Sequence, residues 1–399
     1  MAPSSETDDR NDAVSSDTLP DEITATNRQP LNSSTGTLTS PSPSSSDSTP
    51  LPSLPFEIIV EILTRVPVKF LMQFQSVCKS WKSLISDPNF AKQHLRVSTT
   101  RHHLLLTFGC PSREFVFTAC PLSSVFTEVT ATATQIEYPL NNRNSFDQII
   151  DSCHGILCFA LNQRFVLLWN PSIRKFTKLP SLDNPDRERS YTVYGFGYTH
   201  LSDSYKVVAV SRFCESETQV KVLTLGTNAW RRILDFPLGV TFYGSGKFVS
   251  GTVNWLASIN SYSSWVIVSL DLEKESYQEL LLPDYGGVTV VTLSLGVLQD
   301  CLCILSNSDT FSDVWLMTEY GNNYSWTKLF RIPYMGGVGF CPYNKTLYVS
   351  EDDKVLLKYQ SSLVVYNARD GTLKTPEIKN INGWVVPEIY QESLISPCS

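Results

Sequence analysis

Residues 168–180 read Leu-Trp-Asn-Pro-Ser-Ile-Arg-Lys-Phe-Thr-Lys-Leu-Pro, an apolar strand followed by a polar hinge and a second short strand that ends in proline. The same order of features recurs in residues 222–237, 268–283 and 314–333. These segments follow one another at about 45 to 50 residues, the length of a four-stranded propeller blade of the kelch kind. We therefore interpret each segment as the outer hairpin of one blade and predict an all-β propeller.

The alternating apolar pattern of these strands begins near Arg101 and continues almost to the end of the chain. We place six blades, at residues 102–140, 151–180, 191–237, 244–283, 293–333 and 338–380, although five or seven also fit the pattern. A late apolar run from Glu388 to Ile395 is a candidate to return and complete the first blade, which would close the ring.

The N-terminal part of the chain has a different composition. Residues 1–50 are dominated by Ser, Thr, Pro, Asp and Asn, which predicts a disordered tail. From Leu51 apolar residues recur at helical spacing, and we predict a small all-α module of three short helices in residues 51–96, with a turn around Phe70 and Leu71 and a last helix capped by Asp87 and Pro88. The module carries more large apolar side chains than so small a core can bury, which indicates a bound partner.

Composition and charge exclude several classes of function. The 399-residue chain has a net charge of −7, so no basic field favours nucleic acid, and no apolar run is long enough to span a bilayer. We expect a soluble intracellular protein of the cytoplasm and/or nucleus. The ten cysteines are irregularly spaced within apolar runs, which is typical of reduced core thiols.

Motifs for catalysis or cofactor binding are missing from the sequence. It contains no phosphate-binding loop, no zinc-binding His-Glu-x-x-His helix and no Gly-x-Ser-x-Gly elbow. Cys153, His154 and Cys158 lie close together, but one strand cannot direct all three at a metal, so core packing explains them better. We predict no catalytic residue, no cofactor and no metal site.

Two segments at the start of the predicted helical module are distinctive. Residues 54–71 read Leu-Pro-Phe-Glu-Ile-Ile-Val-Glu-Ile-Leu-Thr-Arg-Val-Pro-Val-Lys-Phe-Leu, and residues 77–90 read Val-Cys-Lys-Ser-Trp-Lys-Ser-Leu-Ile-Ser-Asp-Pro-Asn-Phe. Together they resemble the F-box of plant F-box proteins. The rest of the chain resembles the F-box-associated interaction domain with kelch-like repeats, through segments such as 151–158 and 254–256. His154 stands where the family often has Asn, and Phe70 where it often has a small residue.

The resemblance covers residues 51 to about 397 and implies an F-box at 51–96 and a kelch-like propeller at 101–397, after the disordered tail that composition predicts at 1–50. It also implies a non-catalytic, substrate-recognition subunit of an SCF-type cullin-RING E3 ubiquitin ligase. The F-box would bind a SKP1-type adaptor and through it a cullin, and the propeller would bind a protein substrate for ubiquitination and proteasomal degradation. The positions matching the family's SKP1-binding face are Leu54, Pro55, Ile58, Ile62, Leu63, Pro67, Leu71, Val77, Cys78, Trp81 and Leu84.

Some of these residues have a second interpretation. Ile62, Cys78 and Leu84 are equally consistent with closing the core of the helical module. Trp81 is the strongest candidate for a contact, because buried aromatics contribute disproportionately to interface energy.

The competing class is an enzyme, since propellers also hold hydrolases and oxidases that use carboxylates around the central channel. Acidic residues such as Asp203, Asp271, Glu273 and Asp313 lie in predicted turns or strand ends, where solvation is the ordinary explanation. Co-purification with SKP1 would separate the two classes.

The target-binding face is predicted from topology. Connections from the outer strand of one blade to the inner strand of the next all emerge on the same face of a propeller. These connections are rich in Tyr, Phe and Arg, which favours a protein target, although about half of such residues would plug the channel mouth. The predicted residues are Asn144, Phe146, Arg187, Arg189, Tyr191, Tyr194, Phe242, Tyr243, Asp284, Tyr285, Tyr334 and Met335.

Overall fold

The computed structural model assigns the chain to two units, of which the second is Leu54–Ser399. All the residues that it describes belong to the second unit. They are residues 54–98, 101–109, 115–140, 148–162, 164–182, 191–213, 218–236, 240–259, 264–334, 343, 345–381 and 385–398.

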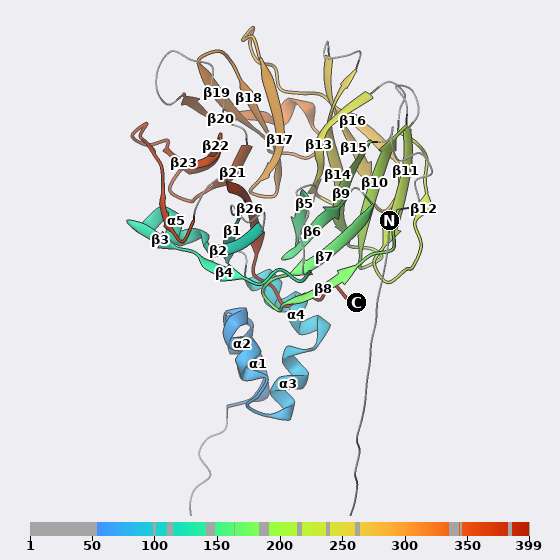
Figure 1. Cartoon of the computed structure of the whole chain (residues 1–399), viewed down its shortest axis with the longest axis vertical. Coiled ribbons are helices and arrows are strands. Elements are labelled where there is room, and N and C mark those ends of the chain that lie inside the picture. The colour runs from blue at the N-terminus through green and yellow to red at the C-terminus, as the bar shows by residue number, and fades with distance from the viewer. Residues whose placement is uncertain are drawn as a thin grey trace, which may run out of the picture. The chain divides into compact units, whose positions relative to one another are not determined.

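Four helices form a helical module at the start of this unit, α1 (Phe56–Thr64), α2 (Val68–Phe74), α3 (Lys79–Ile85) and α4 (Pro88–Val97). Figure 1 shows them together in blue. The sequence predicted three, with a turn around Phe70 and Leu71. That turn is helix α2, because Pro67 has the φ of −56° that suits a residue starting a helix. Asp87 caps α4 as predicted, accepting the N–H of Asn89 at 2.7 Å.

Six four-stranded sheets follow, each ordered from its inner to its outer strand. Blade 1 contains β26 (Val385–Gln391), β1 (His102–Gly109), β2 (Phe115–Pro121) and β4 (Thr134–Ile136). Blade 2 contains β5 (Gln148–Cys153), β6 (Ile156–Leu161), β7 (Phe165–Asn170) and β8 (Lys175–Lys178). Blade 3 contains β9 (Tyr191–Thr199), β10 (Ser204–Arg212), β11 (Thr218–Thr224) and β12 (Arg231–Arg232).

The other three sheets repeat this order. Blade 4 contains β13 (Val240–Val249), β14 (Thr252–Ile259), β15 (Ser264–Asp271) and β16 (Tyr277–Leu280). Blade 5 contains β17 (Thr292–Leu298), β18 (Cys301–Asn307), β19 (Phe311–Met317) and β20 (Trp326–Pro333), and blade 6 contains β21 (Lys345–Val349), β22 (Lys354–Tyr359), β23 (Ser362–Asn367) and β24 (Leu373–Lys374). The remaining elements are α5 (Leu122–Thr127), the 3₁₀ turn η1 (Asn323–Ser325), and the parallel pair β3 (Thr130–Thr132) and β25 (Glu377–Lys379).

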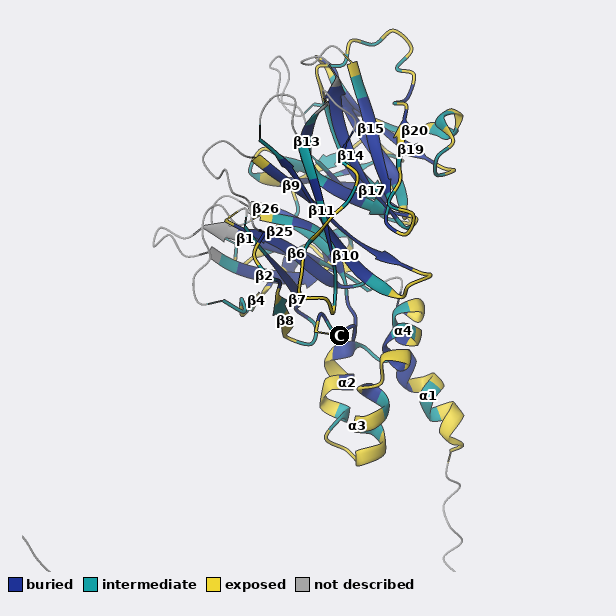
Figure 2. Ribbon diagram, turned by 90° about the vertical axis from the view of Figure 1, so that its right-hand side faces the viewer, coloured by how far each residue is buried: buried dark blue, intermediate teal, exposed yellow. Residues whose placement is uncertain are grey.

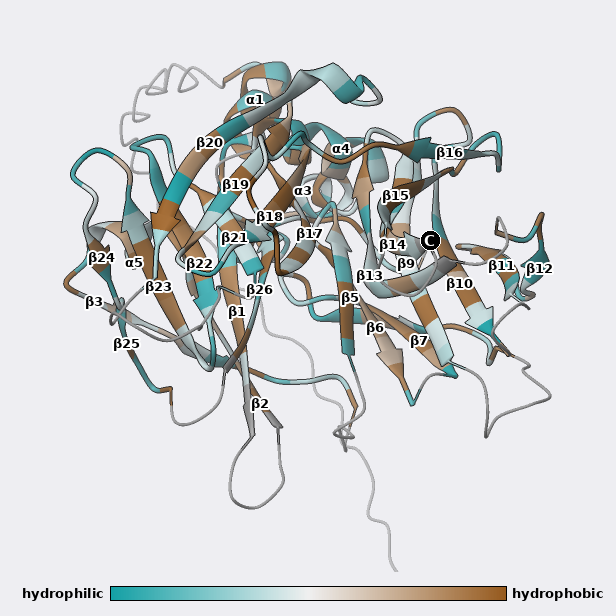
Figure 3. Ribbon diagram, turned by 90° about the horizontal axis from the view of Figure 1, so that it is seen from above, coloured by the Kyte–Doolittle hydropathy of each residue, from teal (hydrophilic) through white to brown (hydrophobic). Residues whose placement is uncertain are grey.

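The inner strands of these sheets form a closed ring. Contacts run from β26 to β5, β9, β13, β17, β21 and back to β26, and Figure 3 places β5, β13, β17 and β21 near the centre. β26 pairs antiparallel with β1, so that Ile389 lies opposite Leu104. The six-bladed propeller and its completion by the late strand are therefore confirmed.

Close packing between blades explains two glycines in β9. A Cβ atom on Gly195 would lie 2.3 Å from a methyl group of Val253, and one on Gly197 would lie 2.2 Å from the ring of Phe248. Side chains of blade 4 occupy the space that a larger residue in blade 3 would need. These glycines therefore serve the packing of blade 3 against blade 4.

Antiparallel order assigns two faces to the propeller. Turns between first and second strands, and between third and fourth strands, lie on one face, which we call the module face. Connections from one blade to the next lie on the opposite face, which we call the loop face. Lys92 of α4 pairs with Asp203, in the turn between β9 and β10. The helices therefore lie against the module face.

The C-terminal segment after β26 packs between the helices and the propeller (Figure 2). Asn170 donates hydrogen bonds from Nδ2 to the carbonyl oxygens of Ser393 at 3.1 Å and Ile395 at 2.8 Å. Leu394 and Ile395 then join the apolar cluster that contains Leu71 of α2. This segment extends one core from the blades into the helical module.

Candidate functional site

Helices α1 and α2 and the segments that precede α1 and α3 expose apolar residues to solvent, and Figure 2 shows exposed stretches along these helices. Helix α1 is apolar on two sides: Leu63 is 2% exposed and faces the module core, whereas Ile58 and Ile62 are 42% and 49% exposed. A helix that is apolar on both sides is normally covered on both. Met72 of α2 is also exposed, at 36%. We give the name module surface to the six large apolar residues of these helices and segments that are more exposed than Met72, namely Leu54, Phe56, Ile58, Ile62, Phe70 and Val77.

The predicted SKP1-binding residues fall into three groups by exposure. Exposed residues are Leu54, Pro55, Ile58, Ile62, Val77 and Cys78. Pro67, Trp81 and Leu84 are half-buried, and Leu63 and Leu71 are buried. Leu63 and Leu71 pack inside the module core, so they support the surface from behind rather than forming part of it.

Trp81 has a mixed position within the module. Its ring packs against Phe74 with 5.5 Å between the centroids, and it also packs against the core cluster. Cys78, at the start of α3, is fully exposed, and the Ser80 hydroxyl at 3.1 Å from its Sγ is the main group that lowers the pKa of the thiol. Ile62 and Cys78, which the sequence also allowed in the core, therefore lie outside it.

Sequence reasoning missed two members of the module surface. Phe56 is 51% exposed and Phe70 is 46% exposed. Phe70 was recognised only as a departure from the family's usual small residue. The sequence did offer a signal for Phe70, since a large apolar residue stands where the family often has a small one, and that departure could have suggested an exposed side chain.

The buried ring of His94 and the half-buried guanidinium of Arg101 fix the end of α1 against α4. The carbonyl oxygen of Val66 accepts hydrogen bonds from Arg101 at 3.0 Å and, at 2.8 Å, from Nε2 of His94 in the tautomer that is protonated there. Burial lowers the pKa of His94, which favours the neutral ring. The helices that carry the module surface are thereby held in fixed relation to one another.

The predicted target face is the loop face, opposite the helical module. Asn144, Phe146, Arg187, Arg189 and Met335 lie outside the described residues. Tyr191 and Asp284 are exposed, and Tyr243, Tyr285 and Tyr334 are half-buried. Tyr194 and Phe242 are 2% and 8% exposed and belong to interblade cores. We therefore exclude these last two from the candidate surface.

The described part of the channel mouth offers little room for a ligand. A cavity of about 30 Å³ lies between β5, β9 and β13, with Tyr191, Tyr194 and Gly244 in its lining. That volume is about the share of one water molecule in the liquid.

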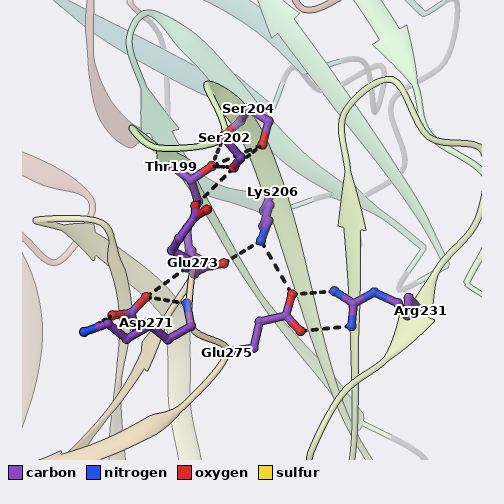
Figure 4. Close-up of polar contacts among 10 residues, drawn as sticks. Thr199, Ser202, Ser204, Lys206, Arg231, Asp271, Glu273 and Glu275 are labelled. Carbon is purple, nitrogen blue, oxygen red and sulfur yellow. Dashed lines mark hydrogen bonds and ion pairs between the residues drawn. The ribbon is translucent and has the colours of Figure 1, made fainter.

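A polar cluster joins the β9–β10 turn of blade 3 to the β15–β16 turn of blade 4 (Figure 4). The Ser202 hydroxyl donates to Glu273 at 3.1 Å. The Lys206 ammonium donates to the carbonyl oxygen of Leu272 at 2.6 Å and lies 3.5 Å from a carboxylate oxygen of Glu275. The cluster fastens neighbouring blades together.

The other acidic residues considered for catalysis also have partners. Asp203 pairs with Lys92, and Asp271 accepts two backbone N–H bonds within its own turn. Asp313 binds the guanidinium of Arg331 at 2.7 Å. These carboxylates belong to blades 3, 4 and 5 and do not converge on one point. Within the described ranges, no group of three or more His, Cys, Asp or Glu side chains is arranged to hold a metal.

Among the described helices, none has the length and apolar character needed to cross a bilayer.

Comparison with known proteins shows which family has this architecture. The family model for the F-box associated beta propeller domain matches residues 67–339. The F-box/kelch-repeat protein At3g23880 of Arabidopsis thaliana is 33% identical over 357 residues, covering 86% of this chain and 96% of that protein. F-box protein CPR1 of the same plant is 29% identical over 379 residues, covering 86% and 89% of the two chains. The chain belongs to the plant F-box proteins of the F-box/kelch-repeat type, which carry an F-box-associated β-propeller.

Proposed function

We propose that this protein is a non-catalytic subunit of an SCF-type ubiquitin ligase, in which helices α1 to α4 act as the F-box and bind a SKP1-type adaptor. Through that adaptor a cullin would be recruited, and the propeller would hold a protein substrate for ubiquitination and degradation. The observation that carries the proposal is the module surface, with six large apolar side chains exposed on α1, on α2 and in the segments that precede α1 and α3. The proposed setting is the cytoplasm and/or nucleus.

The arrangement of the two parts supports this division of labour. The module packs against the module face, which leaves its exposed apolar side and the loop face pointing away from one another. An adaptor and a substrate could then bind at the same time without competing for surface. A rigid connection between them suits a protein that must present a substrate at a fixed position.

Adaptor binding is tested by co-purification of the full chain with a SKP1-type protein. Replacing both Ile58 and Ile62 by Asp should abolish capture, because it places two charges in an apolar interface, while both side chains lie outside the module core. Val97→Asp is the matched control, since Val97 is also an exposed apolar residue of the module, at 44% exposure, but is not among the predicted contacts.

The Trp81→Ala variant tests the strongest single contact and should weaken adaptor binding by roughly 2–4 kcal/mol. Trp81 also packs on Phe74, so the melting temperature of the Trp81→Ala variant must be measured as well, to separate loss of binding from loss of folding. Undiminished capture in the double Asp variant, with an unchanged melting temperature, would refute the adaptor site.

Substrate binding is tested by affinity purification under proteasome inhibition. The intact chain is compared with a variant in which Arg187, Tyr191, Tyr243 and Tyr285 are changed to Ala. A control variant changes Leu201 and Tyr324, which are 86% and 98% exposed in turns of the module face. Partners that depend on the loop face should be lost from the first variant only. If every partner besides SKP1 and cullin persists there, the loop face is not the recognition surface.

A further inference from the structure

A cavity of about 420 Å³ lies between the helical module and the propeller. One wall comes from α2, α3 and α4, and the other from turns of blades 2 and 3 and from the C-terminal segment. Its volume is within the range of about 300 to 1,000 Å³ that is typical of small-molecule sites. The apolar and aromatic part of its lining consists of Met72, Ile85, Ala91, Ile173, Tyr198, Tyr205, Leu225, Leu394 and Ile395.

Both carboxylates that line the cavity already have partners. Asp87 caps α4 by accepting the N–H groups of Asn89 and Phe90, at 2.7 and 3.1 Å. Asp203 accepts the Tyr198 hydroxyl and pairs with Lys92. The charge of Asp203 is therefore neutralised by Lys92, and the charge of Asp87 is partly offset by the positive N-terminal end of α4.

One of the two lysines in the lining is unpaired among the described residues. Lys175, the first residue of β8, lines the cavity, and within the described part of the chain its ammonium has no hydrogen-bond or ion-pair partner. Lys92 pairs with Asp203 and Asp87 caps α4, so Lys175 is the one charged side chain of the described lining without a partner.

We propose that this cavity binds a small amphipathic carboxylate, with its apolar body between the helices and the propeller and its carboxylate at Lys175. An apolar body gains free energy by displacing water from the aliphatic and aromatic walls. A single negative charge complements the free ammonium, whereas a cationic ligand would meet Lys175 with like charge.

The position of the cavity gives such a ligand a structural effect. Met72 and Ala91 belong to helices of the module, while Ile173 and Leu225 belong to the propeller. A ligand that contacts both walls stabilises the packed arrangement, because it binds that arrangement and not one in which the walls have separated. It should therefore raise the melting temperature of the full chain.

The experiment uses dodecanoate as the probe, with dodecan-1-ol and dodecylammonium as matched uncharged and cationic probes. Binding to the full chain is measured by isothermal titration below the micellar concentration of each amphiphile. We expect dodecanoate to bind with one-to-one stoichiometry, about fivefold tighter than the alcohol, the size expected for a solvent-exposed ion pair. Dodecylammonium should bind more weakly than either.

Variants then locate the probe. Lys175→Gln should remove the advantage of dodecanoate over the alcohol and leave binding of the alcohol unchanged. Lys178→Gln is the matched control on the same strand, because Lys178 lies over the ring of Phe165 and does not line the cavity. Ser86→Trp, at an exposed lining position just after α3, should block both probes. Ala91→Leu narrows the cavity from another helix, should weaken both probes and replaces Ser86→Trp if that variant does not fold.

Three results would overturn the proposal. The first is absence of saturable dodecanoate binding to the intact chain. The second is an unchanged preference for the acid in Lys175→Gln. The third is undiminished binding to a folded cavity-filling variant, which would place the probe elsewhere, for example on the module surface.

Discussion

His154 occupies a tight, buried turn between β5 and β6, at a position where the family often has Asn. Its φ is +52°, and Gly155 follows with a φ of +81°. A Cβ on Gly155 would lie 2.4 Å from the Ser393 hydroxyl, so this turn requires glycine for both space and conformation. The His154 ring makes a hydrogen bond of 3.0 Å to the Tyr205 hydroxyl. Burial lowers the pKa of the ring to about 4.

This low pKa predicts a pH dependence of stability. The unfolded chain protonates His154 below about pH 6.5, but the folded chain does so only near pH 4. Acidification through this window therefore favours unfolding, by about 1 to 2 kcal/mol at pH 5. His154→Asn should lose less stability between pH 7 and pH 5 than the wild type, because Asn tolerates the positive φ but does not titrate. Urea unfolding of both proteins at the two pH values measures the difference. If the free energy of unfolding falls equally in both proteins between pH 7 and pH 5, His154 is not the group responsible.

At the scale of elements, β26 is the strand that closes the propeller. It supplies the inner strand of blade 1, and Glu388 on it pairs with Lys345 of blade 6. Without β26, the backbone groups of β1 that face the channel would lose their partners, and the ring would open between blades 6 and 2. An unpaired inner edge is a site for aggregation.

Truncation tests this closure. A chain ending at Lys379 should aggregate or elute as large species in size-exclusion chromatography. A chain ending at Gln391 is the comparison, because it keeps β26 and loses the segment that packs between the helices and the propeller, and so separates loss of the strand from loss of that segment. Monomeric elution and a cooperative melt for the shorter chain would show that closure does not depend on β26.

Across the whole of the described unit, the helical module and the propeller share a core. One apolar cluster contains Leu63 and Phe90 from the helices, Ile150 and Phe196 from the blades, and Leu394 from the C-terminal segment. Hydrogen bonds from Gln391 to the carbonyl oxygens of Leu95 and Ser98 add to this junction. We therefore expect the helices and the blades to unfold in one cooperative transition.

Leu394→Ala tests this coupling. Leu394 is 8% exposed, and its truncation should lower the free energy of unfolding by about 2–4 kcal/mol. Hydrogen exchange in α1 to α4 should accelerate although the substituted residue is distant in sequence. Leu281→Ala is the control, because Leu281 is 60% exposed and should change little. Unaltered exchange in the helices of the Leu394 variant would indicate that the module is stable by itself.

The repeat, the late strand and the apolar excess of residues 51–96 could be predicted from the sequence, because they depend on local periodicity and on spacing along the chain. The count of six blades was chosen over five or seven only by the structure, in which the inner strands close a ring. The sequence also identified Asp87 and Pro88 as a helix start, since capping involves only neighbours. Tertiary structure decided which apolar residues are exposed: Ile62 and Leu63 are adjacent and equally apolar, and only packing against α4 and the C-terminal segment buries one of them. The cavity likewise depends on bringing Met72 beside Leu394, and no local pattern encodes a contact across more than three hundred residues.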